Sequence, residues 1–153
     1  MAGLLATLAE DSDVIIGLEA DPGKSKPEVT IALHNATLRD ILNAVVASEP
    51  RYQWLESAEA IEVIPTAGSS ILLDTPITSL QVKDVRRSEA INQLMALPEV
   101  QALMISMNLK LRPASLSPTW VKDEKFSLNL NRVTLRQAVQ RIVKQSGARF
   151  WMF

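Results

Sequence analysis

The sequence predicts an α+β fold in which two small tandem units of βαβ repeats pack their helices on short mixed sheets. The first observation is an internal repeat, because residues 29–56 and 126–153 share one pattern at a constant offset without a gap. The second is a change of hydrophobic period within each copy, from two to about 3.6 and back, which indicates strand, helix and strand. The predicted first unit spans 1–65, a linker spans 66–76, and the second unit spans 77–153.

Length and composition limit the class of protein. The 153 residues, of which 47% are hydrophobic, suffice for one ordinary domain or two small ones with a packed core. The net charge of −1 argues against wholesale binding to nucleic acid or a membrane surface. The absence of cysteine excludes disulfides and zinc–thiolate sites. No apolar run reaches the roughly 20 residues of a membrane helix, and the chain begins as if inside a helix. We therefore expect a fragment of a longer protein, without membrane insertion.

The first unit is predicted to begin with a helix over residues 2–10, in which leucines share one face. A short buried strand is expected at 14–16, and a half-buried strand at 29–33, where apolar and polar residues alternate. After the first repeated helix, residues 52–55 and 61–64 are predicted to form a hairpin. The first unit therefore has every expected element except an opening strand.

A Thr-Leu-Arg corner starts each repeated helix. Thr37 with Asp40, and Thr134 with Gln137, have the spacing of a helix cap and its first-turn partner. In both helices the apolar residues recur at i, i+3, i+4, i+7 and i+8, which predicts that one face packs on a sheet. These residues are Leu38, Ile41, Leu42, Val45 and Val46 in the first helix, and Leu135, Ala138, Val139, Ile142 and Val143 in the second.

The second unit is predicted to open with a strand over residues 77–82, followed by a helix. Pro98 suits the first turn of a helix but not its interior, because proline has no backbone N–H. We therefore expect a kink or a break at Leu97 and further helix through Ile105.

The carboxy-terminal strand is expected to lack a neighbour. Residues 109–111 are predicted as a strand and 113–125 as a loop, and the closing strand of the second unit is missing. Residues 149–153 therefore have no counterpart to the strand that 61–64 supply in the first unit. Because this apolar strand would be left with unmet backbone groups, we expect a concentration-dependent oligomer with the strand in or beside the contact.

The phrases VTIALHNATLRDILNAVV and FSLNLNRVTLRQAVQRIV resemble the secretin and TonB short N-terminal domain, in which an alternating strand, a Thr-Leu-Arg-like corner and a helix recur. Counted as two copies, one strong and one partial, the resemblance covers nearly the whole chain. It implies two packed βαβ units in a periplasmic or cell-envelope protein, with a signal peptide upstream of this fragment. The matching residues are core and capping residues, so the resemblance implies a fold and no reaction.

The sequence contains no constellation for catalysis, a cofactor or a metal ion. His34 is the single histidine and stands at the end of a predicted strand, without metal-ligand residues at suitable spacing. Asp11 and Asp13 are interpreted as turn acids rather than as paired carboxylates for acid–base chemistry. The five glycines form no phosphate-binding loop. We therefore expect a protein that is not an enzyme.

Aromatic and basic residues are the candidates for an interface. Trp54 and Trp151 are interpreted as core residues of equivalent strands, with an aromatic binding platform as the alternative. Trp120 lies in a Pro-rich loop, where an interface role competes with packing of the loop on the sheet. The basic helix face of Arg136, Arg141 and Lys144 is interpreted as solvated, with contact to an acidic partner as the alternative. The possible interface comprises Trp120, Arg136, Arg141, Lys144, Phe150 and Trp151.

The expected function is a non-enzymatic protein-interaction module of a bacterial cell-envelope protein. It would dock an envelope component or another copy of itself through exposed strand edges, and no small-molecule substrate is indicated. The alternative is a nucleic-acid or polyanion binder that uses the basic carboxy-terminal unit, in which no acidic residue follows Glu124. Salt distinguishes the two, because polyanion binding weakens steeply as salt rises whereas edge docking changes little.

Overall fold

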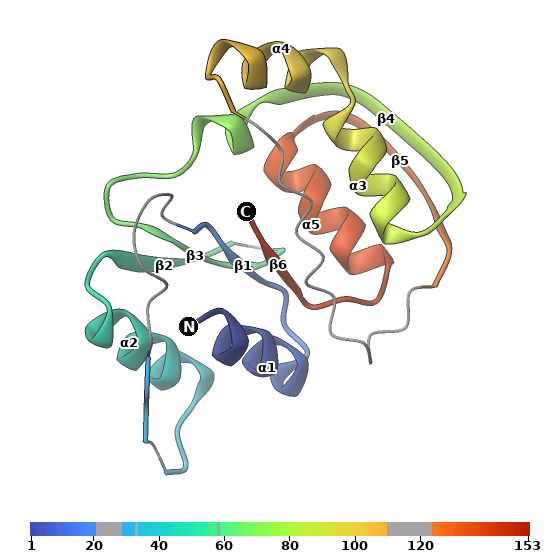
Figure 1. The fold of residues 1–153 in the computed structure, drawn as a ribbon. Coiled ribbons are helices and arrows are strands. Elements are labelled where there is room, and N and C mark those ends of the chain that lie inside the picture. Colours follow the sequence, from blue (N-terminus) through green and yellow to red (C-terminus); the bar gives the residue numbers. More distant parts are fainter. Residues whose placement is uncertain (21–28, 33, 58, 110–123) are drawn as a thin grey trace. The chain divides into compact units, whose positions relative to one another are not determined.

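The computed structural model describes residues 1–20, 29–32, 34–57, 59–109 and 124–153. It is a mixed α+β fold, as the sequence predicts, and it divides into two compact units (Figure 1). Unit 1 comprises Met1–Ser69 together with Arg149–Phe153, and unit 2 comprises Ser70–Ala148.

Unit 1 contains a four-stranded sheet in the order β2-β3-β1-β6. The strands are β1 (Ile16–Leu18), β2 (Tyr52–Glu56), β3 (Ile61–Pro65) and β6 (Phe150–Met152). β2 and β3 form an antiparallel pair, which confirms the predicted hairpin. β1 runs parallel to β3 on one side and to β6 on the other. β2 and β6 are therefore the edge strands of this sheet.

Two helices, α1 (Ala2–Ser12) and α2 (Leu38–Ser48), pack on this sheet (Figure 1). Alternate side chains of the strands contribute to the packed face, because successive residues of a strand point to opposite sides. The resulting hydrophobic cluster comprises Leu5, Ala9, Ile16, Leu18, Leu42, Tyr52, Ile61 and Val63. The first strand begins later than the predicted 14–16, because the N–H groups of Asp13 and Val14 still donate to carbonyls of α1.

Unit 2 is built on an antiparallel two-stranded ribbon of β4 (Pro76–Val85) and β5 (Phe126–Thr134). Its helices are η1 (Ile71–Asp74), α3 (Arg87–Met95), α4 (Pro98–Ser106) and α5 (Leu135–Gln145). α3 packs against α5, and the two helices also contact the ribbon. The buried residues of this unit include Leu72, Leu73, Ile77, Leu80, Val82, Ala90, Leu94, Val100, Leu130, Leu135, Ala138 and Ile142.

The interruption predicted at Leu97 is confirmed, and it is a break between the helices α3 and α4 rather than a kink. Leu97 caps the start of α4 with an extended backbone, and Pro98 occupies the first helical turn. A backbone N–H in the first turn of a helix has no intrahelical partner. Proline, which lacks this group, therefore costs the new helix no hydrogen bond.

The boundaries of the units differ from the sequence prediction. The break follows Ser69, inside the predicted linker 66–76. The second half of that linker belongs to the core of unit 2, because η1 buries Leu72 and Leu73 almost completely. Residues 149–153 were predicted for the second unit, but they belong to unit 1, where β6 pairs with β1.

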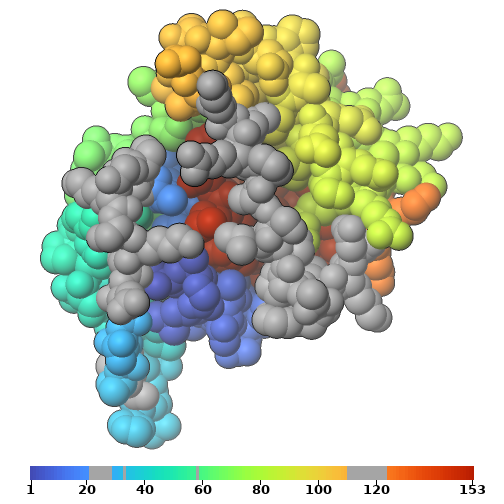
Figure 2. Space-filling model, viewed as in Figure 1, coloured from blue at the N-terminus to red at the C-terminus, as the bar shows by residue number. Residues whose placement is uncertain are grey.

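The predicted strand at 29–33 is not found among the residues that the structure describes. Residues 29–32 form no strand, and together with residues 34–37 they project from the body of unit 1, drawn in light blue in Figure 2. The alternation of apolar and polar residues at these positions is typical of a strand with one buried and one exposed face. A strand is stable, however, only when a neighbouring strand exchanges backbone hydrogen bonds with it. The sequence pattern contained no information about that neighbour.

The internal repeat is reproduced in the helices and not in the strands around them. α2 and α5 begin and end at equivalent positions of the two copies. Trp54 and Trp151 lie in β2 and β6, but β2 pairs antiparallel with β3 whereas β6 pairs parallel with β1. The tandem repeat as a whole therefore stays a prediction. The predicted strand at 109–111 and loop at 113–125 fall largely outside the described residues.

Candidate functional site

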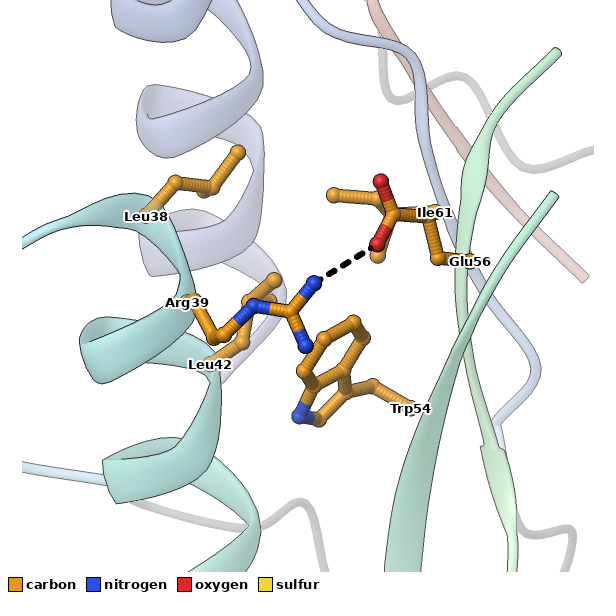
Figure 3. Close-up of a pocket in the computed structure, with 6 residues that line it drawn as sticks. All are labelled: Leu38, Arg39, Leu42, Trp54, Glu56 and Ile61. Carbon is orange, nitrogen blue, oxygen red and sulfur yellow. Dashed lines mark hydrogen bonds and ion pairs between the residues drawn. The ribbon is translucent and has the colours of Figure 1, made fainter. Parts of the chain in front are cut away.

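A groove lies between the first turns of α2 and the hairpin of β2 and β3 in unit 1 (Figure 3). Its volume is about 200 Å³. The lining combines apolar side chains with an exposed ion pair, and comprises Leu38, Arg39, Leu42, Trp54, Glu56 and Ile61. A groove of this size accommodates one side chain of a bound polypeptide, whereas sites for drug-sized ligands are larger.

A reciprocal cap between Thr37 and Asp40 fixes the first turn of α2, which forms one wall of the groove. The Asp40 N–H donates to Thr37 Oγ1 (3.2 Å), and the Thr37 N–H donates to Asp40 Oδ2 (3.0 Å). The Thr37 hydroxyl also donates to Asp40 Oδ2 (2.6 Å). The bond from the Thr37 hydroxyl, and to a smaller extent the bond from the Thr37 N–H, hold the pKa of the Asp40 carboxyl below its ordinary value, because both bonds favour the charged form.

Arg39 joins the helix wall of the groove to the strand wall. Its guanidinium carbon lies 5.1 Å from the centroid of the Trp54 ring, and its Nη2 donates to Glu56 Oε2 at 3.0 Å (Figure 3). The Trp54 Nε1–H donates to Asn43 Oδ1 at 3.0 Å, which holds the indole against α2. The side chains of Arg39 and Glu56 are 66% and 60% exposed, so their ion pair contributes little to stability. Breaking this ion pair would therefore cost little free energy.

The hydrogen bonds at both ends of the hairpin determine which backbone groups of β2 face β3. The Thr66 N–H donates to Arg51 O (2.8 Å) before the strand, and the Ser57 N–H donates to Ala60 O (2.9 Å) after it. Backbone direction alternates along an antiparallel strand. The residues of β2 that bond to β3 are therefore Gln53 and Leu55.

The backbone groups of Trp54 and Glu56 consequently face away from β3, at the outer edge of the sheet and beside the groove. Among the described residues, no strand pairs with this edge. β2 is short and carries one charged residue, Glu56, but other features that protect an edge strand are missing, since it has no lysine and no proline and its register with β3 contains no bulge. The edge of β2 is thus suited to pairing with a further strand.

The carboxy-terminal strand has a partner, and the prediction that it lacks one is wrong. β6 pairs with β1 over three residues, from Phe150 opposite Ile16 to Met152 opposite Leu18. Trp151, at the centre of the strand, is 6% exposed. Pairing between segments so distant in the chain leaves no local signature in the sequence, which is why the partner was missed.

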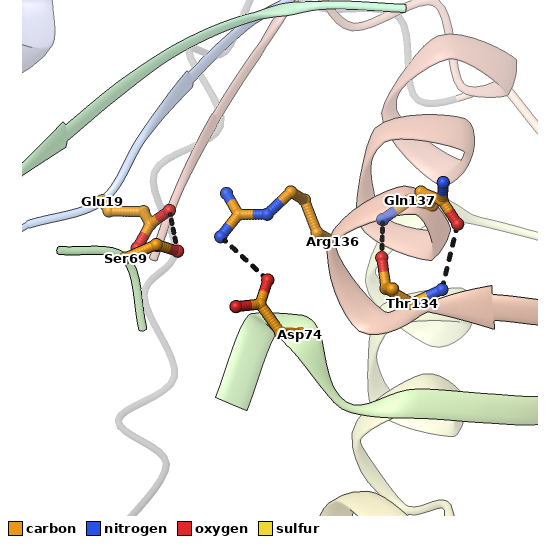
Figure 4. Close-up of polar contacts among 6 residues, drawn as sticks. All are labelled: Glu19, Ser69, Asp74, Thr134, Arg136 and Gln137. Carbon is orange, nitrogen blue, oxygen red and sulfur yellow. Dashed lines mark hydrogen bonds and ion pairs between the residues drawn. The ribbon is translucent and has the colours of Figure 1, made fainter. Parts of the chain in front are cut away.

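The basic face of α5 is only partly open. The Arg136 side chain is 13% exposed, and its Nη2 lies 3.6 Å from Asp74 Oδ1 (Figure 4). Arg141 is half-buried and takes part in a further interaction. Lys144 is exposed in the last turn of the helix.

The aromatic candidates for an interface differ in where the structure places them. Phe150 is half-buried and packs against the hydrophobic cluster of unit 1. Trp54 lines the groove and is half-buried, so the alternative of an aromatic platform remains open for it. Trp120 lies outside the described residues.

The described residues offer no arrangement for metal or acid–base chemistry. His34 is exposed. Asp13 accepts a hydrogen bond from Arg149 Nε at 2.6 Å, so it pairs with a cation rather than with Asp11. Within the described part of the chain, no group of three or more His, Cys, Asp or Glu residues could hold a metal ion. None of the described helices has the length and apolar character needed to cross a membrane.

Sequence reasoning missed three charged residues. Arg39 and Glu56 form the ion pair of the groove, and Glu19 is a buried carboxylate that accepts hydrogen bonds from Ser69 Oγ at 2.9 and 3.2 Å (Figure 4). The repeat contained a signal for Arg39 alone, since it aligns with Arg136. That signal is the same for both arginines, and it could not show that Arg39 is exposed whereas Arg136 is largely buried.

The site combines an edge of β2 that no described strand covers, a groove for one side chain, and an exposed Arg–Glu pair. The resemblance of the two repeated phrases to the secretin and TonB short N-terminal domain stays a resemblance of sequence. No protein-family model, curated protein or solved structure matches this chain.

Proposed function

We propose that this chain is a non-enzymatic protein-interaction module that binds an extended segment of another polypeptide along an edge of the unit 1 sheet. The observation that carries the proposal is the edge of β2, where the backbone groups of Trp54 and Glu56 face away from β3. An added strand would satisfy these groups. The groove beside them would receive a side chain of that strand, so the backbone supplies affinity and the groove supplies specificity.

The location in a bacterial cell envelope, in the periplasm, is proposed on the sequence resemblance alone. The phrases that carry it surround Thr37 and Thr134, which cap α2 and α5. These residues are determinants of the fold, so they support a type of domain, whereas the location follows from the family resemblance and the identity of the partner is left to experiment.

The alternative function, binding of nucleic acid or another polyanion, receives less support from the basic helix α5. Arg136 is directed at Asp74, and Arg141 is half-buried. A polyanion site needs several exposed cations that neutralise several phosphates together. Of the three basic residues considered on α5, only Lys144 has that exposure.

Photo-crosslinking in cells that carry the native gene tests the proposal. The photoreactive residue p-benzoylphenylalanine at Leu55, which is 50% exposed on β2, is expected to capture a polypeptide. The same residue at Ile105, which is 76% exposed on α4, is the matched control and is expected to capture much less. Equal capture at both positions, or capture at Ile105 alone, would overturn the proposal.

Salt dependence separates the proposal from the alternative. Binding through backbone hydrogen bonds should persist when salt is raised to about 0.5 M, because these bonds depend little on screening. Binding to a DNA duplex or heparin through cations would weaken by orders of magnitude over the same range. The probe for the alternative is therefore heparin, measured with the purified chain at low and high salt.

A further inference from the structure

We infer that the polypeptide that pairs with β2 is a second copy of this chain, joined edge to edge in antiparallel orientation about a two-fold axis at Leu55. The inference rests on the proposed function, since it names the partner of the same edge. In two copies related in this way, the unit 1 sheet of one copy would continue into the unit 1 sheet of the other. A two-fold axis is the commonest symmetry of protein dimers, and it closes the assembly at two copies.

The backbone determines the register. The backbone groups of Tyr52, Trp54 and Glu56 face outward, because backbone direction alternates along β2. The Tyr52 N–H donates to Glu49 O, whereas no hydrogen bond is found among the described residues for the outward groups of Trp54 and Glu56. In an antiparallel ladder, two opposite residues with outward groups exchange both of their hydrogen bonds. Pairing Trp54 with the partner's Glu56, and Glu56 with the partner's Trp54, satisfies all of these groups in both copies. The centre of that register is Leu55.

The same register removes an exposed apolar side chain from water. Leu55 is 50% exposed on the face of β2 opposite to Trp54. At the centre of the pairing it would lie directly opposite the partner's Leu55, as a pair without backbone hydrogen bonds, in which the two Cα atoms are about 4.5 Å apart. Side chains approach most closely in pairs of this kind, so the two leucines would cover each other.

The charges beside the edge also suit this register. The partner's Glu56 would lie next to Trp54, whose ring is covered by the guanidinium of Arg39. Arg39 already donates to Glu56 of its own chain, and it has further N–H donors for the second carboxylate. Each Glu56 would stand opposite a tryptophan rather than opposite the partner's Glu56, so no like charges meet directly across the two strands.

Disulfide trapping in the full chain tests the register, since the natural sequence has no cysteine to interfere. Leu55→Cys is expected to form a covalent dimer under mild oxidation, because the two Cα atoms lie within the reach of a disulfide. Gln53→Cys is the matched control on the same face of the same strand. In the inferred register the two copies of residue 53 are about 13 Å apart along the strand, so this variant is expected to remain monomeric on a denaturing gel.

Sedimentation of the full chain tests the association itself. The unmodified chain is expected to show a concentration-dependent dimer, and Leu55→Lys is expected to raise its dissociation constant at least about tenfold, because two ammonium groups would replace the leucine pair. Ile105→Lys, a change at an exposed apolar residue of α4, should leave the dimer unchanged.

The outcomes separate the inference from the proposed function. Disulfides formed equally by Leu55→Cys and Gln53→Cys, or a dimer that Leu55→Lys does not weaken, would overturn the two-fold register. A strict monomer at all concentrations, combined with photo-crosslinking of a different polypeptide at Leu55, would overturn self-association and retain strand addition. A strict monomer with no crosslink at Leu55 would overturn both.

Discussion

Gly17 of β1 and Trp151 of β6 are register partners in adjacent parallel strands, and the indole of Trp151 lies where a Cβ on residue 17 would project. Such a Cβ would collide with the ring carbons Cε2 and Cζ2 and would lie 2.7 Å from Nε1. The absence of a side chain at residue 17 therefore makes room for the buried ring. This contact is part of the packing of β6 against β1, beside the backbone hydrogen bonds that pair the two strands.

Gly17→Ala is expected to destabilise the protein by about 1–3 kcal/mol, because the added methyl group overpacks the contact with Trp151. Urea unfolding followed by circular dichroism measures the change. Gly3→Ala is the control, since a Cβ on residue 3 has no heavy atom within 4 Å and lies in helix α1. The control should be neutral or slightly stabilising. Equal stability of Gly17→Ala and the natural chain would contradict the close packing of Trp151 on residue 17.

Thr134→Ala is expected to cost about 1 kcal/mol through loss of the cap of α5. The Gln137 N–H donates to Thr134 Oγ1 (3.2 Å), and the Thr134 N–H donates to Gln137 Oε1 (3.1 Å), as Figure 4 shows. The midpoint of thermal unfolding measures the effect. Thr134→Ser retains the hydroxyl and should recover most of the loss, whereas an alanine variant as stable as the natural chain would show that the cap contributes nothing.

The cap of α2 makes a prediction about pH. The Thr37 hydroxyl and N–H lower the pKa of Asp40, so the carboxylate stabilises the fold at pH values above the pKa of Asp in the unfolded chain. That contribution is lost as the pH falls through the lowered pKa of the folded state. An NMR titration of the Asp40 carboxyl should give a pKa below that of unfolded Asp. Thr37→Val removes the hydroxyl and should raise it, and an unchanged value would contradict the assigned cause.

The two equivalent arginines of the repeat are expected to differ in their effect on stability. Arg39→Ala should cost less than about 1 kcal/mol, since Arg39 is 66% exposed and keeps only a surface ion pair and a contact with Trp54. Arg136→Ala should cost more, about 1–2 kcal/mol, because its side chain is 13% exposed and contributes packing as well as the contact with Asp74. Chemical denaturation of both variants measures the difference. The reverse order would contradict the deeper burial of Arg136.

Local patterns in the sequence predicted several elements correctly. The helices α2 and α5 follow from apolar periodicity, and their starts follow from Thr37 and Thr134, whose hydroxyls bond to backbone groups within the same turn. The break at Pro98 follows from the chemistry of one residue. Each of these features depends on residues within a few positions of one another, so no knowledge of the rest of the fold was needed.

The candidate site could be predicted only in part. Trp54 was singled out as an aromatic residue in a strand, but its neighbours in the groove, Arg39 and Glu56, were not. They approach Trp54 from the start of α2 and the end of β2, and the 3.0 Å contact between them depends on how the helix packs on the hairpin. Sequence spacing does not determine that packing, because a helix can lie on a sheet in several orientations.

The sequence by itself determined the α+β class, the amphipathic helices with their caps, and the hairpin of β2 and β3, since all of these follow from short-range periodicity and turn chemistry. Only the tertiary structure decided that residues 71–74 are core, that residues 29–32 are not in a strand, and that β6 joins the sheet of unit 1. The physical reason is that a strand pairs with a strand from a distant part of the chain, and an apolar turn is buried by side chains from distant segments.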